Sequence, residues 1–164
     1  MEAGKNGEGE MMPAIGLKII RGGEVEWDTT VMKEGYVIMV EDGEILEIEA
    51  VIILPDREYK YIPKTLPIFF SVTPNGSTAP IEFIEAPARL RNGKYEAKTR
   101  LEVKRQWFIS EKVKRLVAQY PGGDEVVYEK HTWKKLGRLG WLSKKTVREE
   151  LEEAATYVNL AYLE

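Results

Sequence analysis

The chain has 164 residues and a net charge of −3, and its 43% hydrophobic and 31% charged residues are typical of a folded globular protein. It contains no cysteine and one histidine, which excludes disulfide bonds, a thiolate nucleophile and zinc bound by sulfur. No segment reaches the roughly 18 apolar residues that cross a bilayer, and the first residues lack the apolar core of a signal peptide, so we expect a cytoplasmic protein with no membrane partner.

Residues 1–12 are rich in glycine and predict a disordered tail, and residues 13–107 predict an antiparallel β domain. Strand-like runs end at turn residues about every ten positions. Gly22-Gly23, Asp42-Gly43 and Asn92-Gly93 are the dipeptides of two-residue turns. The number of runs, about seven to nine, indicates a sandwich or a small barrel.

The run 94–104 alternates strictly and so assigns the two faces of one strand. One face is predominantly apolar and consists of Tyr95, Ala97, Thr99, Leu101 and Val103. The opposite face is charged and mostly cationic, which is typical of a solvated surface.

After Gln106 the apolar spacing changes, and we expect helices over 110–120, 132–139 and 143–162, with 125–130 as a short strand or an extended connection. Ser110, Thr132 and Ser143 can cap these helices. The last helix would carry an apolar stripe of Val147, Leu151, Ala154, Val158 and Tyr162. The sequence therefore predicts an α+β fold, with the antiparallel β domain followed by a helical segment over 108–164.

The segment "LGRLGWLSKKTVREELEEA", residues 136–154, and the ending "NLAYLE" resemble a helix-turn-helix in its winged-helix form. The resemblance implies that leucines of the first arm pack on Val147 and Leu151 and expose the start of a recognition helix. It also implies binding to duplex DNA. The segment departs from the family in having Trp141 in the corner, Gly137 in the preceding helix and no wing.

Charge is strongly segregated along the chain. Residues 1–60 hold 6 Lys or Arg against 14 Asp or Glu, whereas residues 89–148 hold 17 against 6. A basic half within an acidic protein is expected where one surface meets a polyanion. The alternative is that acidic strands and basic helices neutralise each other within one fold.

The predicted nucleic-acid-binding residues are basic, apart from one aromatic: Lys134, Lys135, Arg138, Lys144, Lys145, Arg148, Arg105 and Trp107. Cations in the first turns of a recognition helix would favour phosphate, because the helix N-terminus already does so. We expect a regulatory or accessory protein that binds duplex DNA, acts as a homodimer or other homo-oligomer and needs no cofactor. The abundance of Glu and Lys with little Gln is typical of thermophile proteins.

Two other functions are compatible with the same residues. Opposite charges could mate between copies in a structural or assembly subunit. A single-strand binder would instead stack bases on aromatic residues beside cations, the candidates being Trp107, Phe108, Tyr95, Trp133 and Trp141.

No residue set indicates an enzyme. The chain lacks a phosphate-binding glycine loop, and His131 has no second histidine with which to bind a metal. Glu47 and Glu49 alternate along a strand as solvated residues do, so we expect no catalytic residues and no metal site.

Overall fold

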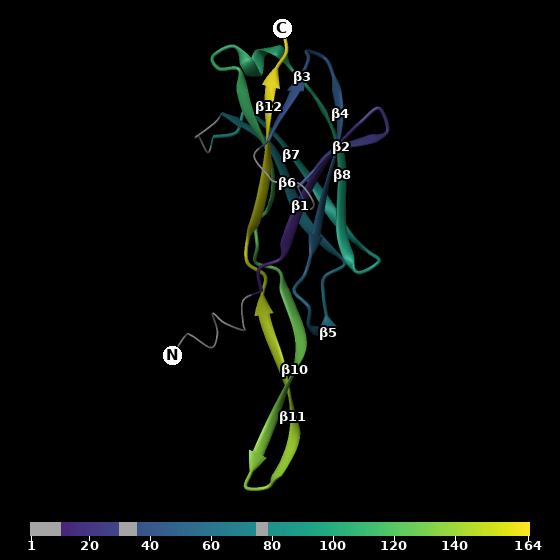
Figure 1. Ribbon diagram of the computed structural model, residues 1–164, viewed down its shortest axis with the longest axis vertical. Coiled ribbons are helices and arrows are strands. Elements are labelled where there is room, and N and C mark those ends of the chain that lie inside the picture. The colour runs from purple at the N-terminus through teal and green to yellow at the C-terminus, as the bar shows by residue number, and fades with distance from the viewer. Residues whose placement is uncertain (1–10, 30–35, 75–78) are drawn as a thin grey trace.

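The computed structural model describes residues 11–29, 36–74 and 79–164, and nearly all of its regular structure is β strand (Figure 1). In this part of the chain one short 3-10 helix, η1 (Arg105–Phe108), is present. The strands are β1 (Ala14–Arg21), β2 (Glu24–Asp28), β3 (Val37–Val40), β4 (Ile45–Ile53), β5 (Glu58–Tyr61), β6 (Thr65–Pro74), β7 (Glu82–Arg91), β8 (Lys94–Glu102), β9 (Val113–Tyr120), β10 (Glu125–Leu136), β11 (Leu139–Glu150) and β12 (Ala154–Tyr162).

Nine strands form one curled sheet in the order β2-β1-β4-β8-β7-β6-β9-β12-β3. Neighbouring strands are antiparallel except β12 and β3, which are parallel. The sheet folds back on itself, because β1 contacts β9 and β12 although they lie far along the order. The concave side holds the core, where alternate residues such as Leu17, Ile48, Phe70, Leu116 and Val158 are fully buried.

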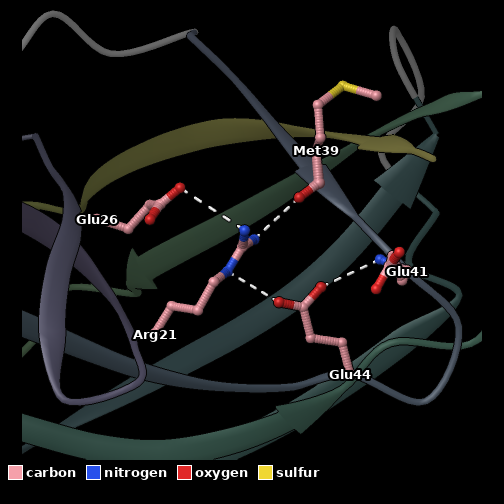
Figure 2. A network of polar contacts seen from close by, with 5 residues as sticks. All are labelled: Arg21, Glu26, Met39, Glu41 and Glu44. Carbon is pink, nitrogen blue, oxygen red and sulfur yellow. Dashed lines mark hydrogen bonds and ion pairs between the residues drawn. The ribbon is translucent and has the colours of Figure 1, made fainter.

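Arg21, at the end of β1, ties the two edges of the curled sheet together (Figure 2). Its Nε lies 2.8 Å from Glu44 and its Nη1 lies 3.6 Å from Glu26 of β2. Its Nη2 donates a 2.9 Å hydrogen bond to the Met39 carbonyl of β3. Strands β2 and β3 are the first and last strands of the sheet, so this one guanidinium joins the two edges of the sheet. It also occupies the Met39 carbonyl, a backbone acceptor with which a strand of another chain could otherwise pair.

The expected antiparallel β structure of residues 13–107 is present, and two of its turns are confirmed. Asn92 and Gly93 have φ of 52° and 81°, as a two-residue turn between β7 and β8 requires. Gly22 and Gly23 form the corresponding turn between β1 and β2. The predicted faces of β8 are also confirmed, with the alternate residues from Tyr95 to Val103 buried or half-buried.

The Asp42-Gly43 turn exists, but the strands on either side of it do not pair with each other. β3 pairs with β12, whereas β4 pairs with β1 and β8. The turn is held by other contacts: Gly43 N donates to the Val103 carbonyl at 2.8 Å, and Arg105 N donates to Asp42 Oδ1 at 2.7 Å.

The predicted helical segment and its resemblance to a helix-turn-helix are wrong. The expected helix 110–120 is strand β9, and the expected helices 132–139 and 143–162 are occupied by β10, β11 and β12. The fold is therefore all-β and not α+β. β9 and β12 belong to the same nine-stranded sheet as the strands before residue 107.

Residues 1–12 were predicted to form a disordered tail. Residues 1–10 lie outside the described residues, so the structure describes only Met11 and Met12 of this segment. Met11 is fully buried in the core, and its carbonyl accepts a 3.1 Å hydrogen bond from Glu152 N. Met12 is 53% exposed. Residue 11 thus contacts the segment that joins β11 to β12.

β10 and β11 form a long hairpin that continues the β9–β12 pair beyond the sheet (Figure 1). Tyr120 pairs with Ala154 and Glu125 with Glu150, so four residues on one side oppose three on the other. This extra residue is a bulge, which bends and twists a strand pair. Gly123 N donates to the Leu151 carbonyl at 2.9 Å, and Leu151 N donates to the Asp124 carbonyl at 2.7 Å, so the bend is hydrogen-bonded.

Gly122 allows the two chain segments to approach at this bend. Its φ is +84°, and a Cβ there would lie 2.8 Å from Glu153 N. We predict that Gly122→Ala lowers the free energy of unfolding by about 3 kcal/mol, since it combines left-handed strain with a backbone clash. Gly22→Ala, at φ +61° with open space around it, is the control and should cost only about 1–2 kcal/mol. If urea unfolding shows the same loss of free energy of unfolding for Gly122→Ala and Gly22→Ala, the close approach at Gly122 is contradicted.

Candidate functional site

Six of the eight predicted binding residues lie on the β10–β11 hairpin and its turn: Lys134, Lys135, Arg138, Lys144, Lys145 and Arg148. The other two, Arg105 and Trp107, lie in η1 at the opposite end of the molecule (Figure 1). Arg105 is exposed, but Trp107 is only 5% exposed and packs beside Phe108 with ring centroids 6.2 Å apart. The structure therefore brings the hairpin cations together and separates η1 from them.

The outer part of the hairpin stands clear of the rest of the described protein. β5 pairs with β10 only as far as Glu129, opposite Glu58. Beyond that point β10 and β11 pair with each other alone, out to Leu136 opposite Leu139. Gly137 turns the chain with a φ of +61°, which fits the glycine that a two-residue hairpin turn requires. We call residues 130–145 the distal ribbon.

The distal ribbon contains six Lys or Arg and no Asp or Glu. Its formal charge is therefore +6, which leaves −9 on the remainder of a chain whose net charge is −3. Among the described residues, five of its cations form no ion pair: Lys134, Lys135, Arg138, Lys144 and Lys145. The ribbon thus presents a concentrated positive potential outside an acidic body.

Like charges face each other across the ribbon. Lys130 lies directly opposite Lys145, and on the other face Lys144 lies opposite the imidazole of His131. His131 Nε2 is 2.7 Å from Glu58 Oε2 at the proximal end. A directly opposed pair of like charges is unfavourable in a strand pair.

Large apolar side chains are exposed among these cations: Trp133 (64%), Leu139 (74%), Trp141 (50%) and Leu142 (56%). The Trp133 ring lies across Gly140, because a Cβ at Gly140 would fall 2.3 Å from its Cζ2 atom. Trp133 and Trp141 are on opposite faces, since opposed residues share a face and Trp133 pairs with Leu142 while Trp141 pairs with Lys134.

The charge of the hairpin changes from positive to mixed and acidic at its base. Arg148 is bound to Glu125 at 2.6 Å, and Thr146 donates a 2.6 Å hydrogen bond to Glu129. An open groove of about 960 Å³ runs along this region, with Lys130 and Lys145 among its lining residues and Glu149, Glu150, Glu152 and Glu153 among the others. The acidic end of the groove repels anions, so the positive potential of the hairpin is restricted to the distal ribbon.

Aromatic packing fixes the base of the hairpin to the sheet. Tyr59 of β5 and Tyr128 of β10 meet edge to face with centroids 6.3 Å apart, and the Arg57 guanidinium lies 5.6 Å from the Tyr128 ring. Tyr128 donates a hydrogen bond to Glu149. Burial, followed by this hydrogen bond, raises the pKa of Tyr128, and burial raises the pKa of Tyr59 to about 12.

The acidic strand residues considered as a metal site are instead paired with cations. Glu49 lies 3.5 Å from Lys18 and 3.3 Å from Lys98, and Glu47 lies 4.0 Å from Arg100. No group of three or more His, Asp or Glu in the described ranges is arranged to hold a metal ion. The alternative interpretation of the charge pattern, acidic strands neutralised by basic helices, is wrong in its helices. The ion pairs found here join strands β1, β4 and β8 instead.

The aromatic residues predicted to stack on bases are Trp107, Phe108, Tyr95, Trp133 and Trp141. The first three are buried in the core, and only the two on the ribbon are exposed. Leu139 was predicted, with the other leucines of the first arm, to pack on Val147 and Leu151, but it is 74% exposed. Gly140 was predicted to end a helix, but it lies within strand β11. The sequence signal for a hairpin here was the pair of closely spaced glycines at 137 and 140, which is typical of a turn.

Comparison with known proteins assigns no relationship to the chain: no family model matches it, and no curated protein is significantly similar. Within the described residues there is no helix of the length and hydrophobicity that a bilayer crossing requires.

Two packed tyrosines, Tyr59 at the hairpin base and Tyr95 in strand β8 of the core, predict sensitivity to alkaline pH. Burial raises the pKa of Tyr59 and of Tyr95 to about 12, so folding favours the neutral phenols. Their contribution to stability is complete below pH 10, the ordinary tyrosine value, and is lost as pH rises from about 10 through 12. Urea midpoints measured from pH 8 to 11.5 should fall above pH 10, and Tyr59→Phe should flatten that fall. Tyr61→Phe, at an exposed position, is the control.

Proposed function

We propose that the protein binds nucleic acid through the distal ribbon, with duplex DNA as the favoured partner. The observation that carries this proposal is the charge of +6 without a single carboxylate on a ribbon that extends beyond an acidic body. Phosphate contacts supply most of the affinity of such complexes. A regulatory or accessory role, in the cytoplasm and as a homo-oligomer, is part of the proposal.

The dimensions of the ribbon suit a duplex groove. The major groove of B-DNA admits a two-stranded β ribbon. Seven residue steps separate Lys130 from Gly137, a length of about 23 Å at the usual strand rise. Lys134 and Lys145 lie on one face and Lys135 and Lys144 on the other, so a ribbon seated in a groove can contact the phosphate backbones on both sides.

The distribution of apolar residues favours nucleic acid over a lipid surface. A hairpin that enters a bilayer tip first needs an apolar tip, because a charge in hydrocarbon is costly. Here Arg138 is in the turn itself, and each exposed indole has a lysine of β10 on its own face, Lys135 beside Trp133 and Lys134 opposite Trp141. In nucleic acid, phosphates and bases also lie close together along the chain. A surface that mixes cations with aromatic rings therefore matches nucleic acid better than a surface that separates them.

The salt dependence of duplex binding tests this function. If six phosphates are contacted, the slope of log affinity against log salt should be about −5. Alanine at four ribbon positions, Lys134, Lys135, Lys144 and Lys145, should weaken binding and reduce the slope to about −2. The measurement is fluorescence anisotropy with a labelled duplex between about 50 and 300 mM salt, a range over which added salt progressively screens the phosphate contacts.

A matched control removes four exposed cations of the body: Lys64, Arg89, Arg91 and Arg100. It lowers the net charge equally and should leave the slope unchanged. Equal slopes for the ribbon and the body variants, or no duplex binding by the wild type, would contradict the proposal.

A second candidate function is self-assembly, favoured by the opposite charges of the ribbon and the body. The ribbon of one copy would then bind the acidic surface of another. Sedimentation should show oligomers at low salt that dissociate at high salt, in the same way with and without DNA. Salt-independent mass together with salt-dependent DNA binding would exclude it.

A further inference from the structure

The distal ribbon displays one exposed indole on each face, and each has lysines beside it. Trp133 shares its face with Lys135 and Lys144, and Trp141 shares its face with Lys134 and Lys145. Both rings are at least half exposed, and neither belongs to the buried core. Phosphate contacts do not require these rings, so the charge of the ribbon does not explain them.

The position of Trp133 is set by the backbone beneath it. The three atoms nearest to a Cβ built on Gly140 are Cζ2, Cε2 and Nε1 of this indole, at 2.3, 2.7 and 3.0 Å. The ring therefore rests across the glycine and keeps 64% of the residue exposed. Resting on the ribbon reduces its rotational freedom before any partner binds, which lowers the entropy lost when a flat group stacks on it.

In an intact duplex the faces of the bases are covered by their neighbours. An indole can stack on a base only where the base stack is open, as at an unpaired base, and such stacking is worth about fivefold or more in affinity for each base. The phosphates on either side of an unpaired base remain available to cations. A ribbon that alternates indoles with lysines matches both features at once.

We propose that the distal ribbon recognises unpaired bases within duplex nucleic acid, with Trp133 and Trp141 stacking on the displaced bases while the lysines of the same faces contact the flanking phosphates. This inference rests on the proposed function and names its substrate class. Trp133 and Trp141 give the preference for the open site, and the lysines give affinity for any duplex.

The experiment compares three labelled oligonucleotides by anisotropy: a perfect duplex, the same duplex with a two-nucleotide bulge, and the bulged strand alone. The wild type should bind the bulged duplex about tenfold or more tightly than the perfect duplex, with quenching of tryptophan fluorescence. Trp133→Ala with Trp141→Ala should abolish that preference and leave the affinity for the perfect duplex and its salt slope unchanged.

Two further variants control for charge, folding and general loss of apolar surface. Gly140→Ala keeps both indoles and every charge but displaces the Trp133 ring, so it should lose part of the preference at an unchanged melting temperature. Phe83→Ala with Ile109→Ala removes exposed apolar groups of the body, 56% and 80% exposed, and should change neither affinity.

Equal wild-type affinity for the two duplexes, or equal weakening of both by the tryptophan variant, would overturn the stacking inference. Tighter binding of the single strand than of the bulged duplex would also overturn it. In these cases the proposed function still stands if the four-lysine variant lowers the salt slope. Failure of every oligonucleotide to bind, with partitioning into phosphatidylserine vesicles instead, would overturn both.

Discussion

The position of the candidate site depends on one continuous strand pair, in which β9 and β12 run through a bulge into β10 and β11. A two-stranded hairpin alone is only marginally stable in water. Here its base is joined to the sheet by the hydrogen bonds around Leu151, by pairing with β5, and by burial of Val126 and Tyr128. This attachment allows the outer residues to form strands although neither of their faces is buried. A cationic segment without a core of its own can therefore be held in a defined shape.

The sheet and the ribbon use their cations differently. In the sheet, Lys18 and Lys98 flank Glu49 across β1, β4 and β8, and Arg21 joins the sheet edges through two carboxylates and a carbonyl. These contacts hold strands together. The distal ribbon contains no carboxylate, and five of its six cations form no ion pair with the described residues. Cations that hold no strands together are expected where binding and not stability determines the sequence.

Local turn chemistry and alternation were sufficient for the hairpins at Gly22-Gly23 and Asn92-Gly93, but not for strand partners or for the last third of the chain. Asp42-Gly43 specifies a reversal, whereas the partners of β3 and β4 are set by distant strands. In β9 the inward position of Lys114 hides the alternation: its ammonium is only 2% exposed and is bound by the Glu111 carbonyl at 3.1 Å and carboxylate at 3.3 Å. Thr156 hides it in the same way in β12. With polar groups at these inward positions, the remaining apolar spacing fits a helix.

The basic run was recognisable in the sequence because residues close along the chain remain close in either a helix or a hairpin. What the sequence could not supply was the direction of each side chain. On a helix, Lys144, Lys145 and Arg148 would share one face and meet one phosphate backbone. On the ribbon, Lys144 and Lys145 point to opposite faces, and Arg148 is bound to Glu125. The positive potential therefore surrounds the ribbon, which suits insertion between two phosphate backbones better than docking against one.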